Sequence, residues 1–246
     1  MPATPAWPPK SMPRLFVRTP LGAGEAIELD AAQANYLGNV MRLNEADHVL
    51  LFDGVSGEWI ARITEAHKKR MTLAVEDRTR KQEGDSGLWL AFAPVKRAQT
   101  DWLVEKATEL GVARLLPVTT RRTIVERVKL ERLEKIAIEA AEQCNRTSVT
   151  AIEPPLPLDA FLRGRDVGRA LYFADESGGE PAARAFQPGP ATILIGPEGG
   201  FTAEERTAIR SAPNAIAVSL GPRILRAETA ALAAVTTYMA LAGDWR

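Results

Sequence analysis

The chain has 246 residues, 46% of them hydrophobic and 25% charged, and its 31 Lys and Arg balance 31 Asp and Glu. This composition indicates a globular protein of one large or two modest domains, and zero net charge argues against a nucleic-acid binder that depends on overall charge. There is no apolar run near the roughly 20 residues of a membrane helix. A single cysteine cannot form an internal disulfide, and with two histidines it does not make a convincing metal site. We therefore expect a cytoplasmic protein without membrane contact or bound metal.

The first 78 residues predict a tail followed by a small β-rich domain. Residues 1–13 hold five prolines and no hydrophobic segment, which favours a disordered tail over a signal peptide. One helix is expected from Asp30 to about Met41, with Asp30 as N-cap and Gln33 at the reciprocal position. Strands are expected at residues 14–18, 26–29, 48–52, 59–64 and 71–76. Five short strands and one helix in residues 14–78 favour a compact β-barrel.

The remaining chain predicts an α/β domain. Residues 79–87 are polar with two glycines and form the best linker in the sequence. From residue 88 onward, strands and helices alternate. The expected strands cover 88–95, 113–118, 170–174, 193–195 and 215–220, and the expected helices cover 100–110, 130–145 and 222–241. This alternation predicts a mainly parallel sheet in residues 88–246, with helices on both faces.

Two strand–loop–helix junctions near the C-terminus predict a ligand site. In each, a short apolar run meets a Gly-Pro turn before a helix: ILIGPEGGFTAEE at residues 193–205 and AVSLGPRILRAET at residues 217–229. Thr202 and Glu205 form a capping box. Glycines at 196, 199 and 200 would let a ligand lie against bare backbone, and two such loops at neighbouring strand ends form a crevice of the kind where open α/β sheets bind ligands.

The usual nucleotide signatures do not explain this crevice. A phosphate-binding loop of the Gly-x-x-x-x-Gly-Lys-Ser/Thr type is missing, and Gly22-Ala23-Gly24 lacks the third glycine of a dinucleotide fingerprint. Glu198 would repel a polyphosphate. A carboxylate in this loop instead favours a ligand that carries positive charge or offers hydroxyl and amino donors.

These motifs also resemble those of a known family. Residues 196–200 (GPEGG) and 220–230 (LGPRILRAETA) are similar to the RsmE family, as are residues 14–17, 39–42, 101–112 and 138–144. The resemblance runs from about Arg14 to the C-terminus. It implies a SPOUT-type, trefoil-knotted α/β domain behind a PUA-like β-barrel domain. It also implies S-adenosyl-L-methionine as cofactor, a homodimer, and methylation of uridine N3 in 16S ribosomal RNA, within the small ribosomal subunit.

The resemblance places the cofactor in the Gly-Pro crevice. Backbone carbonyls near Gly196 and Leu220 suit a sulfonium cation better than lysines would, and apolar side chains there would contact adenine. The cofactor-binding candidates are Ala174, Leu194, Gly196, Glu198, Gly199, Gly200, Ser219, Leu220, Gly221, Ile224 and Leu225.

Methylating uridine N3 requires loss of an imide proton, so a base or an anion-stabilising group is needed. Arg226 could orient an RNA phosphate or stabilise a uracil anion. Glu228 could be the base or only favour the helix N-terminus, and Glu198 is the alternative base. The choice between the two glutamates stays open, so the catalytic candidates are Arg226, Glu228 and Glu198.

The expected RNA contacts are arginines, whose guanidinium group donates two hydrogen bonds to phosphate at once. The candidates are Arg14, Arg42, Arg121, Arg122 and Arg146. The helix at 222–241 is apolar almost all round, which favours burial against a second subunit. Two other hypotheses stay open: a different RNA target, such as transfer RNA or another ribosomal position, and a non-catalytic RNA-binding assembly factor.

Overall fold

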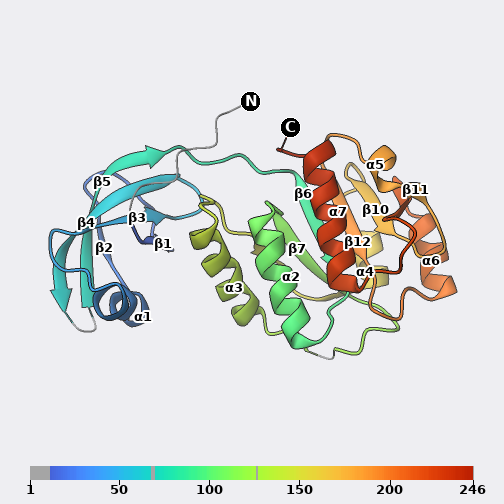
Figure 1. The fold of residues 1–246 in the computed structure, drawn as a ribbon, viewed down its shortest axis with the longest axis horizontal. Coiled ribbons are helices and arrows are strands. Elements are labelled where there is room, and N and C mark those ends of the chain that lie inside the picture. Colours follow the sequence, from blue (N-terminus) through green and yellow to red (C-terminus); the bar gives the residue numbers. More distant parts are fainter. Residues whose placement is uncertain (1–11, 68–69, 126, 246) are drawn as a thin grey trace. The chain divides into compact units, whose positions relative to one another are not determined.

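The computed structural model describes residues 12–67, 70–125 and 127–245 (Figure 1). Residues 1–11 of the predicted disordered tail lie outside this range. At the C-terminal end of the predicted tail, the backbone carbonyl of Pro13 accepts a hydrogen bond from Leu50 N at 2.9 Å, so residue 13 already belongs to the first sheet. The chain divides into two compact units: unit 1 runs to Glu83 and includes Asn145–Ser148, and unit 2 holds Gly84–Cys144 and the residues from Val149 onward.

Unit 1 is a five-stranded, mainly antiparallel sheet in the order β1-β3-β4-β5-β2, with β1 parallel to β3. Its strands are β1 (Arg14–Phe16), β2 (Ala26–Glu28), β3 (His48–Phe52), β4 (Glu58–His67) and β5 (Arg70–Arg80). All five predicted strands are present, although β1 is shorter and β4 and β5 are longer than expected. In the described residues β1 and β2 are the two edges of this sheet. The sequence predicted a compact barrel, but the hydrogen bonds between these strands leave the sheet open.

The predicted helix of unit 1 changes type midway. α1 (Ala31–Asn35) begins where expected, because the Asp30 side chain accepts Gln33 N at 2.8 Å. Gln33 does not bond back to Asp30; its side-chain amide donates to the carbonyl oxygen of Phe16. From Tyr36 to Val40 the chain continues as a π-helix, η1, an uncommon element that often lies near functional sites.

The segment Asn145–Ser148 joins unit 1 through hydrogen bonds that the sequence did not predict. Arg80 Nη2 donates to the carbonyl oxygen of Asn145 at 2.5 Å, and Arg14 Nη2 donates to that of Arg146 at 2.7 Å. Glu83 N donates to Thr147 Oγ1 at 3.0 Å, and Thr147 N donates to the Glu83 carboxylate. Residues 145–148 were expected in the second domain, yet their partners lie in the first.

Unit 2 is an eight-stranded sheet in the order β11-β13-β10-β12-β6-β7-β8, with β9 also paired to β7, and all of its ladders are parallel. The strands are β6 (Leu88–Phe92), β7 (Arg114–Thr119), β8 (Ala151–Ile152), β9 (Leu156–Pro157), β10 (Ala170–Ala174), β11 (Glu180–Pro181), β12 (Ala191–Ile195) and β13 (Ala215–Ser219). Its helices are α2 (Arg97–Glu109), α3 (Leu130–Gln143), α4 (Leu158–Gly164), α5 (Ala182–Ala185), α6 (Ala203–Arg210) and α7 (Ala227–Leu241).

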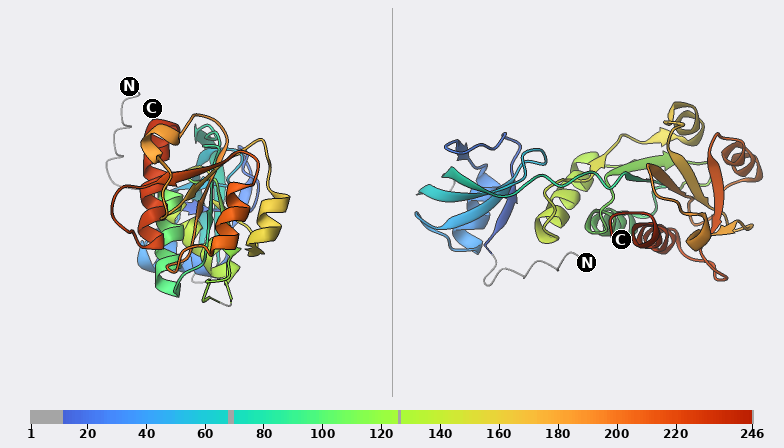
Figure 2. Two further views of the ribbon diagram at one scale, coloured as in Figure 1. Left: turned by 90° about the vertical axis from the view of Figure 1, so that its right-hand side faces the viewer. Right: turned by 90° about the horizontal axis from the view of Figure 1, so that it is seen from above.

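Helices cover both faces of this sheet, as predicted (Figures 1 and 2). Alternate residues of one strand enter different clusters: Leu88, Leu90 and Phe92 pack with α2, α3 and α7, whereas Ala91 packs with α4 and α6. This alternation follows from the two-residue period of a strand, and it explains the almost continuously apolar strand sequences.

The last helix departs from its prediction in two ways. α7 begins at Ala227, not Pro222, so residues 222–226 form a loop. Its buried residues lie along one face, while Thr229, Thr236, Ala240 and Leu241 are exposed. The helix is therefore less uniformly apolar than expected. No helix in the described ranges is long and apolar enough to cross a bilayer.

Candidate functional site

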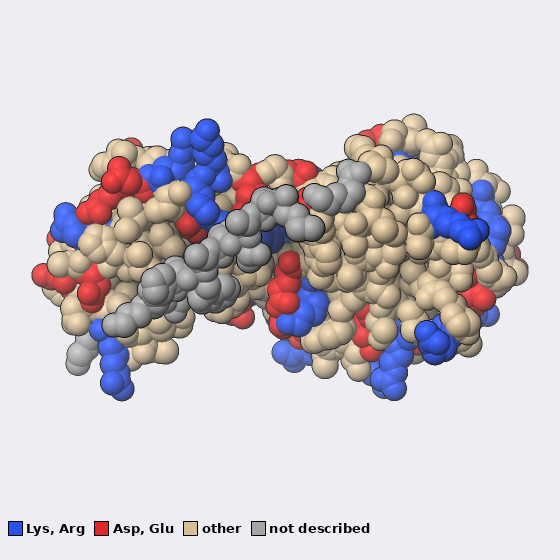
Figure 3. Space-filling view, turned by 45° about the horizontal axis from the view of Figure 1, so that its top comes forward, with Lys and Arg blue, Asp and Glu red and all other residues tan. Residues whose placement is uncertain are grey.

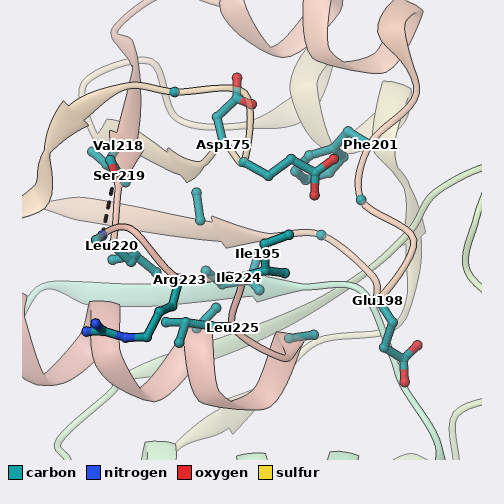
Figure 4. A pocket seen from close by; sticks show the side chains of 18 of the residues that line it. Asp175, Ile195, Glu198, Phe201, Val218, Ser219, Leu220, Arg223, Ile224 and Leu225 are labelled. Atoms are coloured by element: carbon teal, nitrogen blue, oxygen red, sulfur yellow. Dashed lines mark hydrogen bonds between the residues drawn. The ribbon is translucent and has the colours of Figure 1, made fainter.

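A cavity of about 200 Å³ lies where the two Gly-Pro loops meet the start of α7 (Figure 4). It sits at the carboxyl ends of β10, β12 and β13, three neighbouring parallel strands. Open α/β sheets bind ligands at this edge. The structure therefore brings the two sequence motifs together in one site.

The first loop, residues 196–201, is shaped by glycines, but for a different reason than predicted. A Cβ on Gly196 would lie 3.0 Å from the Phe201 ring, and one on Gly200 (φ +67°) would lie 2.5 Å from the Glu176 carboxylate. A Cβ on Gly199 would meet Arg122 Cδ at 3.3 Å, and Gly199 does not line the cavity. The glycines fit the loop against its own neighbours, and the predicted contact of Gly199 with the cofactor stays a prediction.

The second loop, residues 219–226, forms the opposite wall. Ser219, Leu220 and Gly221 line the cavity, as do Ile224 and Leu225. Ser219 Oγ accepts a long hydrogen bond from Gly221 N at 3.4 Å, drawn in Figure 4. Gly221 has φ +110°, a conformation that other residues rarely adopt. The loop thus turns back over the cavity and presents its apolar side chains to it.

Leu194, a predicted cofactor residue, has its side chain outside the cavity. It is fully buried among residues of the α4 and α6 layer, and it does not line the cavity. Ile195, the next residue, does so, because successive side chains of β12 point to opposite faces of the sheet. The predicted lining residues that the structure does place there are Ala174, Gly196, Glu198, Gly200, Ser219, Leu220, Gly221, Ile224 and Leu225.

A third loop, after β10, also lines the cavity. The sequence predicted only Ala174 from this region and none of the residues after it. Asp175 and Glu176 line the cavity, and the Asp175 side chain is only 1% exposed. Burial would raise the pKa of Asp175, but hydrogen bonds from Ser177 and Arg210 and the charge of Arg206 hold this pKa below its usual value. Asp175 therefore stays ionised and anchors the loop. An aspartate directly after a buried strand at the same sheet edge was the available signal.

The three catalytic candidates lie around the cavity. Glu198 is exposed, lines the cavity and points away from Asp175 and Phe201 in Figure 4. Arg226 is the N-cap of α7 and is exposed, and Glu228 is half-buried in the first turn. Neither lines the cavity, although Leu225 and Ala227 on either side of Arg226 do. No described residue forms a hydrogen bond or ion pair with the side chains of Arg226 or Glu198.

Arg121 and Arg122 lie in the turn after β7, next to the first loop. Arg122 Nη1 donates to the carbonyl oxygen of Gly199 at 2.5 Å. The backbone N–H of Arg121 donates to the Glu205 carboxylate at 2.7 Å. Both side chains are exposed, and the Arg122 guanidinium borders the cavity's first loop.

The arginines of unit 1 divide into two kinds. Arg42 is exposed and has φ +58°, and it follows Met41, the C-cap of the π-helix. Arg14 is only 8% exposed, and its Nε donates to Glu58 at 2.6 Å. The ring of Phe52 also lies 4.4 Å from the Arg14 guanidinium carbon. Arg14 is thus buried inside unit 1, which argues against the predicted contact with RNA. Arg146 is half-buried and donates to Ser148 Oγ.

Comparison with known proteins settles the family. The model of the RNA methyltransferase domain matches residues 82–239, and the model of the RNA methyltransferase PUA domain matches residues 29–76. A ribosomal RNA small subunit methyltransferase E from Rickettsia conorii is 32% identical over 228 residues, which cover 90% of this chain and 93% of that protein. The chain belongs to the ribosomal RNA small subunit methyltransferase E family. This is the RsmE family that the sequence motifs resemble.

Solved structures agree with the assignment to the RsmE family. A crystal structure of ribosomal RNA small subunit methyltransferase E from Neisseria gonorrhoeae bound to S-adenosyl methionine has a TM-score of 0.88 and 30% identity, covering 96% of this chain and 100% of that one. A methyltransferase of Legionella pneumophila in complex with the same cofactor has a TM-score of 0.86 and 29% identity, covering 95% and 99%. Unit 1 is accordingly PUA-like, and unit 2 is a parallel α/β sheet like that of SPOUT methyltransferases.

Proposed function

We propose that this chain transfers a methyl group from S-adenosyl-L-methionine to N3 of one uridine in 16S ribosomal RNA, in the small ribosomal subunit. The observation that carries the proposal is the cavity formed by the two Gly-Pro loops, in a chain that matches cofactor-bound RsmE-family structures over almost its whole length. Among the described residues, no group of three or more His, Cys, Asp or Glu could hold a metal ion, and the proposed reaction requires none.

The cavity fits the chemistry of this cofactor. Ile195, Leu220, Ile224 and Leu225 supply apolar surface for an adenine ring. Asp175 and Glu176 are ion-paired with Arg206, which leaves Glu198 as a lining carboxylate with no partner among the described residues. Backbone carbonyl oxygens and an unpaired carboxylate suit a sulfonium and an ammonium group. When bound, S-adenosyl-L-methionine supplies a methyl group activated by its positively charged sulfur.

The chain's own residues would control the proton on uridine N3. Glu198 borders the cavity and Glu228 lies in the first turn of α7, and either carboxylate could accept this proton. Arg226 lies between them in sequence and is free to face the negative charge that develops on the uracil oxygens. In this proposal, the arginine stabilises the anion and one glutamate removes the proton.

The RNA is held by arginines outside the cavity. We assign this role to Arg42, Arg121, Arg122 and Arg146, and exclude Arg14 because it is buried in an ion pair. A homodimer is also part of the proposal, since the exposed face of α7 carries Leu241 at 44% exposure beside threonine and alanine. Figure 3 shows that much of the α/β unit is uncharged on the face drawn there. Sedimentation at micromolar concentration should give a species of twice the chain's 26.7 kDa.

Two measurements test the proposal. Calorimetry should show one cofactor site per chain, and mass spectrometry of ribosomal RNA from a deletion strain should show one uridine that has lost its N3-methyl group. Restoring the gene should restore the methyl group. If the deletion strain instead lacks a methyl group in transfer RNA, transfer RNA is the substrate. If the protein binds the cofactor but the deletion strain lacks no methyl group, a non-catalytic assembly factor is favoured.

A further inference from the structure

A second cavity, of about 140 Å³, lies in unit 2 between the starts of α2 and α3. Its walls come from the residues after β6, the first turn of α2, the segment before α3 and the first turn of α3. The lining residues are Pro94, Val95, Arg97, Thr100, Val125, Arg127, Val128, Lys129, Arg132 and Leu133. Four of these ten side chains are cationic, and no residue that the structure describes in this lining is acidic.

Two of the four cations are already paired. Arg132 Nη1 donates to Asp101, and Arg97 Nε lies 3.9 Å from the same carboxylate. Asp101 Oδ1 and Arg132 Nε are nevertheless buried without a hydrogen-bond partner among the described residues. Arg127 and Lys129 are exposed, and no described residue forms a hydrogen bond or ion pair with either side chain. They leave positive charge at the cavity mouth that these contacts do not neutralise.

The two helix starts add to this positive charge. The N-caps of α2 and α3 are Lys96 and Lys129, and neither makes a side-chain capping hydrogen bond. Helices usually begin with a side chain that accepts a hydrogen bond, and a cation at the positive end of the helix dipole is unfavourable. α2 has no acidic residue in its first turn, and α3 has only the exposed Glu131. An anion between the two helix starts would relieve this repulsion.

The cavity also lies on the edge of the sheet that carries the cofactor cavity. Pro94 and Val95 follow the carboxyl end of β6, which pairs with β12 in parallel. The segment that follows β7 carries Arg122, bonded to Gly199, at one end and Arg127 and Lys129 at the other. A nucleic-acid strand that enters the cofactor cavity could therefore continue along this edge into the second cavity.

We propose that this cavity binds a phosphodiester group of the RNA substrate, held by Arg127 and Lys129 beside the positive ends of α2 and α3. The inference rests on the proposed function for the identity of the RNA. It adds a second anchoring point on the methyltransferase unit, separate from the residues that hold the cofactor and from the arginines predicted from sequence.

The test uses the full chain with Arg127→Ala and Lys129→Ala combined, and a matched control with Arg184→Ala and Lys135→Ala. The control pair is exposed and lines neither cavity. Filter binding with a 16S ribosomal RNA transcript, between about 50 and 200 mM salt, should show roughly tenfold weaker binding for the cavity variant and a salt slope reduced by about 1 to 2. The control should match the parent, and calorimetry should give both variants the parent's cofactor affinity.

Equal RNA affinity and equal salt slope in the cavity variant and the control would overturn the inference. If the double variant does not fold, the single changes Arg127→Gln and Lys129→Gln are measured in the same way. The two proposals fail separately. A parent chain that methylates ribosomal RNA, with a cavity variant that binds like the control, removes only the second site. A parent chain that transfers no methyl group, with a cavity variant that still loses RNA affinity, removes only the proposed reaction.

Discussion

The carboxylate of Glu205 accepts the backbone N–H of Arg121 at 2.7 Å. The same carboxylate accepts Thr202 N at 2.9 Å and completes the capping box of α6. Glu205 is only 9% exposed, so both bonds are shielded from water. One side chain therefore starts the helix after the first Gly-Pro loop and fixes the turn that presents Arg121 and Arg122 beside that loop.

Changing Glu205 to Ala should affect both stability and RNA binding. Loss of the cap and of an acceptor for a shielded N–H should lower the free energy of unfolding by about 1 to 3 kcal/mol. RNA affinity should fall as well, because the turn with Arg121 and Arg122 is released. Glu139→Ala is the control, since Glu139 is exposed and lies in α3, away from the α6 cap. Urea denaturation and filter binding measure the two effects. A Glu205→Ala protein with the parent's stability and RNA affinity would show that the hydrogen bonds of Glu205 contribute to neither.

Arg14 should prove structural. Its change to Ala removes one partner of the buried Glu58 carboxylate, which should lower the free energy of unfolding by about 3 kcal/mol. Arg42→Ala is the comparison, because Arg42 is exposed. It should leave the unfolding free energy unchanged and weaken RNA binding. The reverse result, a stable Arg14→Ala protein with weak RNA binding, would restore the prediction made from sequence.

The Glu58 cluster should also give unit 1 an acid limit. Burial would raise the pKa of Glu58, but hydrogen bonds from Arg14 and Arg80 and their charges hold this pKa below the usual value of a glutamate. The unfolded chain therefore binds the proton more readily. The stabilisation is complete above about pH 4.5 and is lost as pH falls through the lowered pKa of the folded protein. Urea denaturation in that range should show a shallower decline for Glu58→Gln than for the parent, and parallel declines would contradict this.

Much of the fold follows from local sequence. The strands of unit 1 and the α/β alternation of unit 2 are visible as apolar runs between turn residues, and the Asp30 and Thr202 caps mark helix starts correctly. The transfer of Asn145–Ser148 to unit 1 was not predictable, because it depends on Arg14 and Arg80, which lie 132 and 65 residues away in sequence from the carbonyl groups they bind. The open edges of the first sheet likewise depend on strand pairing and not on strand sequence.

The two loops predicted from sequence do border one cavity, whereas the sequence did not predict which of their residues line it. Leu194 and Ile195 are both apolar, and only the strand's orientation decides which faces the cavity. The glycines of the first loop predicted that a ligand would lie close to the backbone. The atoms nearest to these glycines instead belong to Phe201, Arg122 and Glu176. The loop after β10 carries no glycine-proline signature before Asp175, so its role depends on the parallel register of β10 with β12 and β13.

Gly200 should tolerate substitution less well than Gly199. Gly200 has φ +67°, and an added Cβ would meet the Glu176 carboxylate, whereas an added Cβ at Gly199 would meet a flexible arginine side chain. Gly200→Ala should therefore reduce thermal stability and weaken cofactor binding by about tenfold, since backbone strain costs on the order of 1 to 2 kcal/mol. Gly199→Ala should retain cofactor affinity. Calorimetry and thermal melts on the two variants decide this, and equal behaviour would contradict the loop geometry.

Arg226 should matter for the reaction and not for the fold. It is exposed at the N-cap of α7, makes no capping hydrogen bond, and has Ala230 one turn on. A cation at the positive end of a helix is unfavourable, so Arg226→Ala should leave the melting temperature unchanged or slightly raised. The position instead suits a group that meets negative charge on RNA or on the reacting uracil.

Methyl transfer by Arg226→Ala should therefore fall by about two orders of magnitude, the scale seen when a donor to a developing oxyanion is removed. Single-turnover methylation of ribosomal RNA measures this loss. Arg184→Ala is the control, since Arg184 is exposed in the same unit and lines neither cavity. Cofactor affinity should be retained, because Arg226 does not line the cofactor cavity. A retained rate, or a large drop in melting temperature, would show that Arg226 serves the fold or nothing at all, and the anion-stabilising role would then pass to another residue.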